Sequence, residues 1–297
     1  MSLSAEWSYK RHAEVERQHE ELPSVYTHPD SVDAWQHIRM LETALPLLRA
    51  FPDSTWLTIG DGRYGSDAFV LHGRGADVTA SSLSDAMLTI AHQQGYIQQY
   101  RTENAESISQ PDNSYDFILC KQSYHHFPRP AIAFYEMLRV ARRAVVLIEP
   151  IEGRPRLLDW AKQVFKKLIR GDQTVEFESS GNFLYRTSVR EIEKMLTALG
   201  HPCIAVKRFN DFFHPRLARQ TNQGLSLGRV ATRAGILAQD LFCSVRLLNY
   251  GLATIIAFKI DPGTEVSQAL KHQGYEFSQL PRNPYVGDAQ LEKSNGG

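Results

Sequence analysis

A glycine turn and a pair of histidines are the residues of this chain best suited to chemistry. Residues 56–65 read Trp-Leu-Thr-Ile-Gly-Asp-Gly-Arg-Tyr-Gly, so a short apolar strand leads directly into a turn. Glycine admits positive φ and lets a ligand approach bare backbone. The helix predicted behind the turn offers unpaired N–H groups to a polar or anionic ligand. The sequence therefore predicts a nucleotide-like cofactor at residues 60–65.

The histidines follow a second apolar segment, within Ser-Tyr-His-His-Phe-Pro at residues 123–128. Imidazole titrates near neutral pH and is the commonest general base. We expect His125 or His126 to take a proton from an acceptor or to orient that acceptor. The alternative is that one ring covers the cofactor while the other packs against backbone. We expect no metal here, because neighbouring side chains in an extended segment point to opposite sides.

The predicted elements explain how the turn and the histidines come together. Strands are expected at residues 55–59, 76–80, 97–101, 115–120, 144–148, 204–209 and 252–258, with helices between the early ones. This alternation predicts an α/β fold with a doubly wound, Rossmann-like sheet. Such sheets bind ligands beyond the carboxyl ends of their strands. The turn and the histidines both follow strands, so we expect them at that edge.

The organisation of the chain follows from the same pattern. We expect an N-terminal helical cap at 1–50, a cofactor-binding half at 51–150, a helical insertion at 151–182, a C-terminal half at 183–260 that contains a second helical insertion at 211–248, and a tail at 261–297.

Composition excludes several classes of function. Lys and Arg total 33, as do Asp and Glu, so no net charge favours nucleic acid. No apolar run approaches the roughly 18 residues that a transmembrane helix requires. The three cysteines lie far apart and without metal-ligand spacing, which predicts a reduced, cytoplasmic protein.

Two cofactors fit a glycine turn of this kind. Residues 60–65 match G-x-G-x-x-G, the fingerprint of an NAD(P)-dependent oxidoreductase. That class also has an acidic residue about 20 positions later, which binds the ribose. Ser81 and Ser82 stand at that place, with no arginine beside them for a 2′-phosphate. The nicotinamide interpretation is weaker for this reason.

Five segments in order carry a resemblance. They are the strand with its glycine turn, Val-Thr-Ala-Ser-Ser at 78–82, Glu-Asn-Ala-Glu at 103–106, Asp-Asn-Ser-Tyr-Asp-Phe-Ile at 112–118 and Glu-Met-Leu-Arg-Val at 136–140. Together they resemble the class I S-adenosylmethionine-dependent methyltransferases, in the small-molecule branch similar to those of quinone biosynthesis. The resemblance implies a seven-stranded sheet whose last strand is antiparallel.

The resemblance also implies roles for individual residues. Gly60 and Gly62 would pass under the methionine part of S-adenosyl-L-methionine. Asn104 and the backbone of Ala105 would face the adenine, and Lys121 and Gln122 would border the sulfonium.

The chain departs from the family pattern at two places. The acid usual near the end of the first strand is Thr58 here, and Asp61 in the turn is its expected substitute. Ser82 stands where the family has the acid that binds the ribose. These departures keep open a non-catalytic binding protein as a further alternative.

Other polar residues are weaker candidates. Arg39 is expected to pair with the cofactor carboxylate, for which a guanidinium has bidentate geometry, or else to be an ordinary solvated arginine. Glu149 ends a strand at the ligand edge and is expected either to touch the acceptor or to be a plain strand-end carboxylate. His214 is a further candidate base.

The helix expected at residues 157–169 is basic and amphipathic. Six Lys and Arg residues face one acid, Asp159, over residues 154–170, and Lys162, Lys166 and Arg170 form a stripe. Such a helix rests on an anionic membrane surface or covers an acidic substrate, or it is a cap with a solvated cationic face. The positive charge favours an anionic acceptor. We therefore expect a methyltransferase that acts on a small molecule or glycan-type acceptor, with oxygen as the accepting atom.

Overall fold

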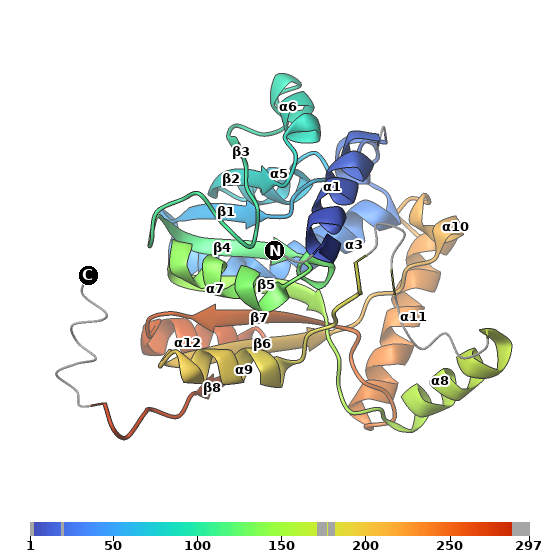
Figure 1. The fold of residues 1–297 in the computed structure, drawn as a ribbon. Helices are drawn as coiled ribbons and strands as arrows, with labels where there is room; N and C mark the ends of the chain where they lie inside the picture. The colour runs from blue at the N-terminus through green and yellow to red at the C-terminus, as the bar shows by residue number, and fades with distance from the viewer. Residues whose placement is uncertain (1–2, 19–20, 171–176, 178–181, 287–297) are drawn as a thin grey trace.

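One eight-stranded sheet organises the protein (Figure 1). The computed structural model describes residues 3–18, 21–170, 177 and 182–286. The strands follow the order β3-β2-β1-β4-β5-β7-β6-β8. The predicted α/β, Rossmann-like sheet is confirmed.

Five parallel strands form the half of the sheet that carries the glycine turn. They are β1 (Thr55–Ile59), β2 (Asp77–Ser82), β3 (Tyr100–Thr102), β4 (Tyr115–Lys121) and β5 (Ala141–Pro150). The order reverses between β1 and β4, where β1 pairs with both β2 and β4. A crevice for a ligand opens at such a reversal, beyond the carboxyl ends of the strands.

The remaining strands are antiparallel to their neighbours. They are β6 (Cys203–Phe209), β7 (Leu252–Phe258) and β8 (Glu276–Gln279). The strand at 252–258 inserts antiparallel between β5 and β6, as the family resemblance implied.

The sheet has eight strands rather than the seven expected. The additional strand, β8, pairs with the outer edge of β6. It lies in the segment 261–297, which was expected to be a tail, and α12 (Gly263–His272) precedes it. Leu270 and Tyr275 are buried, and the Tyr275 hydroxyl donates to the Thr43 carbonyl at 2.6 Å. This part of the chain therefore packs into the core.

Side-chain alternation along the strands builds one core on each face of the sheet. Trp56 and Phe117 belong to the core that includes residues of α5 (Ser66–His72) and α6 (Ala86–Gln93). Leu57 and Ile118, one position further along, belong to the other core, together with residues of α7 (Pro130–Val140) and α9 (Val189–Ala198). Successive residues of a strand point to opposite faces, so burial on both faces explains why these strands are apolar throughout.

The N-terminal helices and the two insertions supply the rest of the described structure. The elements are α1 (Leu3–Gln18), α2 (Ser24–Thr27), α3 (Val32–Leu41), η1 (Glu42–Ala44), α4 (Leu45–Ala50), η2 (Tyr124–His126), α8 (Leu157–Arg170), α10 (Pro215–Ala218) and α11 (Leu227–Ser244). Figure 1 shows α3, α8, α10 and α11 on one side of the molecule, beyond one end of the strands. Across the described ranges, no helix combines the length and the apolar character needed to cross a membrane.

Candidate active site

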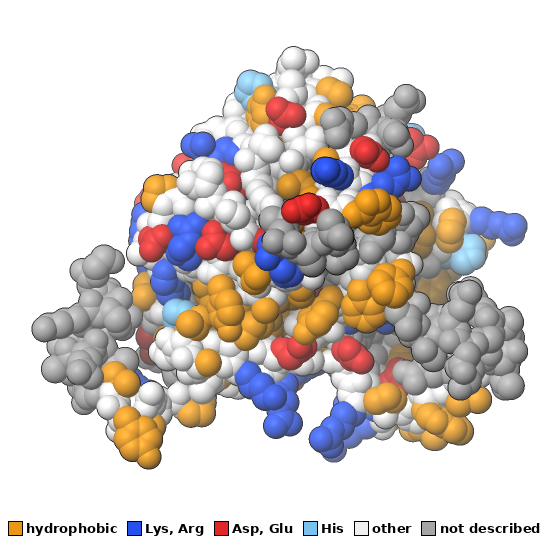
Figure 2. Space-filling view, viewed as in Figure 1, with side chains coloured by type: hydrophobic (Ala, Val, Ile, Leu, Met, Phe, Trp, Pro, Cys, Tyr) orange, Lys and Arg blue, Asp and Glu red, His pale blue; other side chains and the backbone are white. Residues whose placement is uncertain are grey.

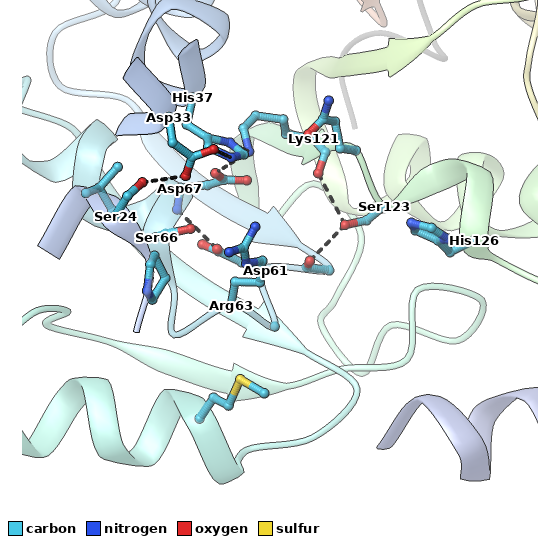
Figure 3. Close-up of a pocket in the computed structure, with 16 residues that line it drawn as sticks. Ser24, Asp33, His37, Asp61, Arg63, Ser66, Asp67, Lys121, Ser123 and His126 are labelled. Atoms are coloured by element: carbon cyan, nitrogen blue, oxygen red, sulfur yellow. Dashed lines mark hydrogen bonds and ion pairs between the residues drawn. The ribbon is translucent and has the colours of Figure 1, made fainter. Parts of the chain in front are cut away.

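A pocket of about 400 Å³ lies where β1 and β4 end (Figure 3). Three segments far apart in the sequence form its walls: the glycine turn after β1, the loop after β4, and α2 with α3 from the N-terminal region. Its lining residues are Pro23, Ser24, Val25, Asp33, His37, Gly60, Asp61, Gly62, Arg63, Ser66, Asp67, Met87, Lys121, Gln122, Ser123 and His126.

The glycine turn packs against the loop after β4. Gly60 has φ +76°, and a Cβ there would stand 2.6 Å from the Cβ of Ser123. The Ser123 hydroxyl donates to the Gly60 carbonyl at 2.8 Å. Gly60 is therefore required by its backbone conformation and by this close packing. Gly62 also lines the pocket and has no positive φ.

Asp61 in the turn holds the start of α5. Its carboxylate accepts the backbone N–H groups of Asp67 at 3.1 Å and Ala68 at 2.9 Å. The Thr58 hydroxyl donates to the same carboxylate at 3.0 Å. Burial raises the pKa of Asp61 to about 7, and the charge of Asp67 adds to the increase. The expected substitute for the missing acid at Thr58 is thus engaged in joining the strand to the helix.

Buried charges meet beside the turn, where α5 begins. Lys121 Nζ lies 2.8 Å from Asp67 Oδ1, and the two side chains are only 6% and 9% exposed. His37 Nδ1 lies 3.4 Å from the same ammonium, and His37 Nε2 lies 3.9 Å from Asp33. Burial, together with the positive charge of Lys121, lowers the pKa of His37 to about 4. In addition, the Ser24 hydroxyl donates to Asp33 at 2.6 Å.

Sequence reasoning missed the contribution of α2 and α3 to the pocket wall. Ser24, Asp33, His37 and Asp67 were not among the predicted site residues, although all four line the pocket. No motif surrounds Ser24, Asp33 or His37, whereas Asp67 lies in α5, two residues after the glycine turn. The first three reach the pocket because the N-terminal helices pack beside α5, where the Tyr26 hydroxyl donates to the Tyr64 carbonyl at 2.7 Å.

The two histidines have different surroundings. His126 lines the pocket. His125 Nδ1 lies 2.6 Å from Glu149 Oε2, and Glu149 is fully buried. The other oxygen of Glu149 accepts the backbone N–H groups of Ser123 at 2.9 Å and Tyr124 at 3.0 Å. Glu149 therefore anchors the loop that carries both imidazoles, whose ring centroids are 4.0 Å apart.

The pocket brings together six of the predicted site residues and leaves five outside its lining. Gly60, Asp61, Gly62, Lys121, Gln122 and His126 line it, whereas Arg39, Ser82, Asn104, Ala105 and His125 are not among its lining residues.

Three of the residues outside the lining lie at the end of β2 and in the segment after β3. The Asn104 side chain accepts the Glu106 N–H at 2.9 Å, and Ala105 is buried. The Ser82 carbonyl accepts the Glu103 N–H at 2.8 Å. The adenine and ribose contacts assigned to these residues stay predictions.

Arg39 is engaged away from the pocket. Its guanidinium donates to the Asn210 carbonyl. The same group lies 5.5 Å from the ring centroids of both Trp35 and Phe209. Burial lowers the pKa of Arg39, and the charges of Asp211 and Asp240 oppose this. In this arrangement the residue joins α3 to the end of β6, and its pairing with the cofactor carboxylate stays a prediction.

Comparison with known proteins identifies the segment that supplies most of the pocket lining. Residues 57–148 match the family model of a methyltransferase domain. This segment includes the glycine turn, β4 and both histidines. No protein of curated function matches the sequence.

Several solved structures resemble the chain. An S-adenosylmethionine-dependent methyltransferase from Thermotoga maritima has 18% identity and a TM-score of 0.48, covering 86% of this chain and 99% of that chain. Magnesium protoporphyrin IX methyltransferase from Synechocystis has 15% identity and a TM-score of 0.48, over 86% and 96% of the two chains. The 1,6-didemethyltoxoflavin-N1-methyltransferase of Burkholderia thailandensis has 14% identity and a TM-score of 0.46, over 88% and 92%. At these similarities, the assignment depends on the matched segment and on the site.

Proposed function

Because the chain belongs, through residues 57–148, to the class I S-adenosylmethionine-dependent methyltransferases, we propose that it methylates an oxygen of a small-molecule or glycan-type acceptor. Its cofactor is S-adenosyl-L-methionine. The family assignment favours this reaction over the NAD(P)-dependent alternative and over a non-catalytic binding protein. Membership of the quinone-biosynthesis branch stays a prediction.

One observation carries the proposal. Eleven of the sixteen lining residues belong to the matched segment, and the pocket lies at the ends of β1 and β4, with the glycine turn on one side and His126 on another. A methyl donor and a proton acceptor are the two parts that O-methylation requires. The volume of about 400 Å³ falls within the usual range of small-molecule sites.

The charged wall of the pocket suits the amino acid part of the cofactor. An ammonium and a carboxylate at one end of a ligand require protein groups of both signs nearby. Lys121 and Arg63 supply positive charge, and Asp33 and Asp67 supply negative charge. Gly60 and Gly62 of the turn line the pocket beside them. These groups would hold S-adenosyl-L-methionine, which supplies an electrophilic methyl group on its sulfonium.

His126 is the proposed general base. It lines the pocket together with Lys121, which ends β4, and with Gln122 and Ser123, which follow that strand. An acceptor hydroxyl must lose its proton as the new carbon–oxygen bond forms, and a neutral imidazole can take that proton. His125, held by Glu149, has the role of keeping the loop and the neighbouring ring in place. Both histidines were predicted as candidates, and the place of His126 in the pocket lining supports its choice as the base.

The acceptor is proposed to be anionic. Arg63 is exposed at the pocket, and Arg216 and Arg219 are exposed in the second insertion. Positive groups around a cleft raise the local concentration of anionic substrates. The acceptor would enter past Arg63 and present its hydroxyl to His126.

Isotope-labelled methyl transfer tests the proposal. The enzyme is incubated with a metabolite extract and S-adenosyl-L-methionine carrying a labelled methyl group, and the products are analysed by mass spectrometry and NMR. We expect one labelled product with the methyl group on oxygen, and a large reduction of it with His126→Ala. A labelled N-methyl or C-methyl product would contradict the proposed acceptor atom, and the absence of any labelled product would contradict the proposed reaction.

A further inference from the structure

Helix α8 turns its apolar residues outward. Leu157, Trp160 and Phe165 are 64%, 59% and 65% exposed, and Val164 is also exposed. Positions 157, 160, 161, 164 and 165 share one side of a helix, because they are separated by steps of one, three and four residues. Figure 2 shows hydrophobic side chains at the surface where Figure 1 places α8. A helix of a soluble protein normally buries such a face.

The start of α8 is fixed to the protein by polar contacts. The Leu158 N–H donates to the Leu247 carbonyl at 3.0 Å. The Asp159 carboxylate accepts the Arg156 N–H at 3.1 Å and the Asn249 side-chain amide at 2.8 Å. These bonds hold the first turn. Within the part of the chain that the structure describes, they leave the apolar face of the helix uncovered.

The charge of this segment is strongly positive. Between residues 154 and 170 the sequence has six Lys and Arg residues and one acid, Asp159. Lys162 is exposed beside the apolar face. The side chains of Lys166, Lys167 and Arg170 lie outside the described residues, so these three contribute to the argument only through their charge in the sequence. An apolar face flanked by cations complements a surface whose outer layer is anionic and whose interior is apolar.

We propose that α8 binds the surface of an anionic lipid bilayer, lying in the plane of the headgroups with Leu157, Trp160 and Phe165 inserted. Apolar burial and attraction to anionic lipids combine in helices of this kind. Each cation near such a surface adds to the affinity. This contact goes beyond the methyl transfer proposed above and does not depend on it.

A second copy of the chain is the other occupant to consider. In a two-fold contact the same patch meets itself. A dimer through α8 would therefore bring two clusters of cations together, with only Asp159 of each chain to offset them. Asp159 is already bound by Arg156 and Asn249. Charge complementarity thus favours the anionic membrane.

Vesicle flotation tests the proposal with the full chain. Vesicles of phosphatidylcholine are compared with vesicles that contain roughly 30% phosphatidylglycerol, whose negative surface attracts basic segments. We expect the protein to float only with the anionic vesicles and to be released by about 1 M salt, which screens charges beyond about 3 Å. We expect Trp160→Glu with Phe165→Glu to abolish binding and Lys162→Gln to weaken it by about fivefold.

Leu199→Glu is the control, because Leu199 is also an exposed large apolar residue but lies at the end of α9. It should bind vesicles as the unmodified chain does. Unchanged thermal unfolding of all variants would show that they fold. Equal binding to both kinds of vesicle, or binding that survives Trp160→Glu with Phe165→Glu, would overturn the proposal. A lipid-free dimer that the same double variant dissociates would also overturn it and would identify a second copy as the occupant.

Discussion

The pocket and α8 both depart from the usual arrangement of a folded protein, in which charged residues are exposed and large apolar residues are buried. At the pocket, charged groups are buried: Lys121 and Asp67 are almost fully enclosed. On α8, large apolar groups are exposed, with Trp160 and Phe165 more than half accessible. Buried charge and exposed apolar surface each cost stability unless a partner compensates. Both regions therefore have the composition of surfaces that receive a ligand, one polar and one apolar.

His126→Ala should have the largest effect on activity and should leave both regions intact. If the imidazole takes the acceptor proton, we expect kcat to fall by about 10²–10⁴. Steady-state kinetics measures kcat, and calorimetric titration measures the affinity for S-adenosylhomocysteine. The affinity for S-adenosylhomocysteine should change little, and a loss confined to that affinity would instead assign His126 to covering the cofactor.

Lys121→Met should destabilise the fold most, because it leaves the carboxylate of Asp67 buried without its cation. Removing one partner of a buried ion pair costs about 3–5 kcal/mol. Urea denaturation of the variant and of the double variant with Asp67→Asn measures this cost. The double variant should recover much of the loss, because it removes the second charge as well. Equal destabilisation by the single and double variants would show that the pair is not coupled.

Glu149→Gln tests the support beneath the histidine loop. The carboxylate accepts from His125 and from the N–H groups of Ser123 and Tyr124. An amide can offer only one acceptor oxygen, so one buried donor loses its partner, at about 1–3 kcal/mol. Glu152→Gln is the matched control, since Glu152 is exposed. Similar unfolding free energies for the two variants would contradict this role.

His37→Gln should change the pH dependence of stability. Burial lowers the pKa of His37 to about 4 from 6.5, so between these values the unfolded chain binds a proton that the folded chain does not. His37 therefore makes the fold more stable as the pH rises through this range. Asp61 acts in the opposite direction, because its pKa is raised from 3.8 to about 7 and the folded chain keeps a proton that the unfolded chain loses.

His37→Gln should remove the contribution of His37 to the pH dependence of the unfolding free energy. Between about pH 4 and 6.5, the slope of the unfolding free energy against pH should be lower for His37→Gln than for the unmodified chain, because the variant lacks the stabilisation that His37 contributes as the pH rises. Urea denaturation at several pH values measures both profiles. Parallel profiles would contradict the burial of a neutral His37.

The sequence pattern predicted those elements that are determined by residues close to one another in the chain. The glycine turn, the apolar strands and the amphipathic α8 each have a period or a motif within about one element. β8 was missed because Glu276–Gln279 has one apolar residue, Phe277, and depends on pairing with β6. The strand is thus fixed by a partner far earlier in the chain, at residues 203–206.

The same limit applies to the site. Gly62, Lys121 and His126 follow strands, so their place at the sheet edge could be predicted. His37 lies on a helix whose periodicity shows which face is apolar but not which element covers it. Arg39 has the right chemistry for a carboxylate, yet packing beside two aromatic rings, from α3 and β6, decides where it lies.

Calorimetric titration of S-adenosylhomocysteine into the unmodified protein and into Gly62→Val is the sharpest test of cofactor binding at the glycine turn. Gly62 lines the pocket without a positive φ, so valine should fold there while obstructing the ligand. We expect saturable binding to the unmodified chain, loss of that binding in the variant, and no heat on titration of NADH. Binding of NADH in place of S-adenosylhomocysteine, or equal affinity in the two proteins, would show that the cofactor site is assigned wrongly.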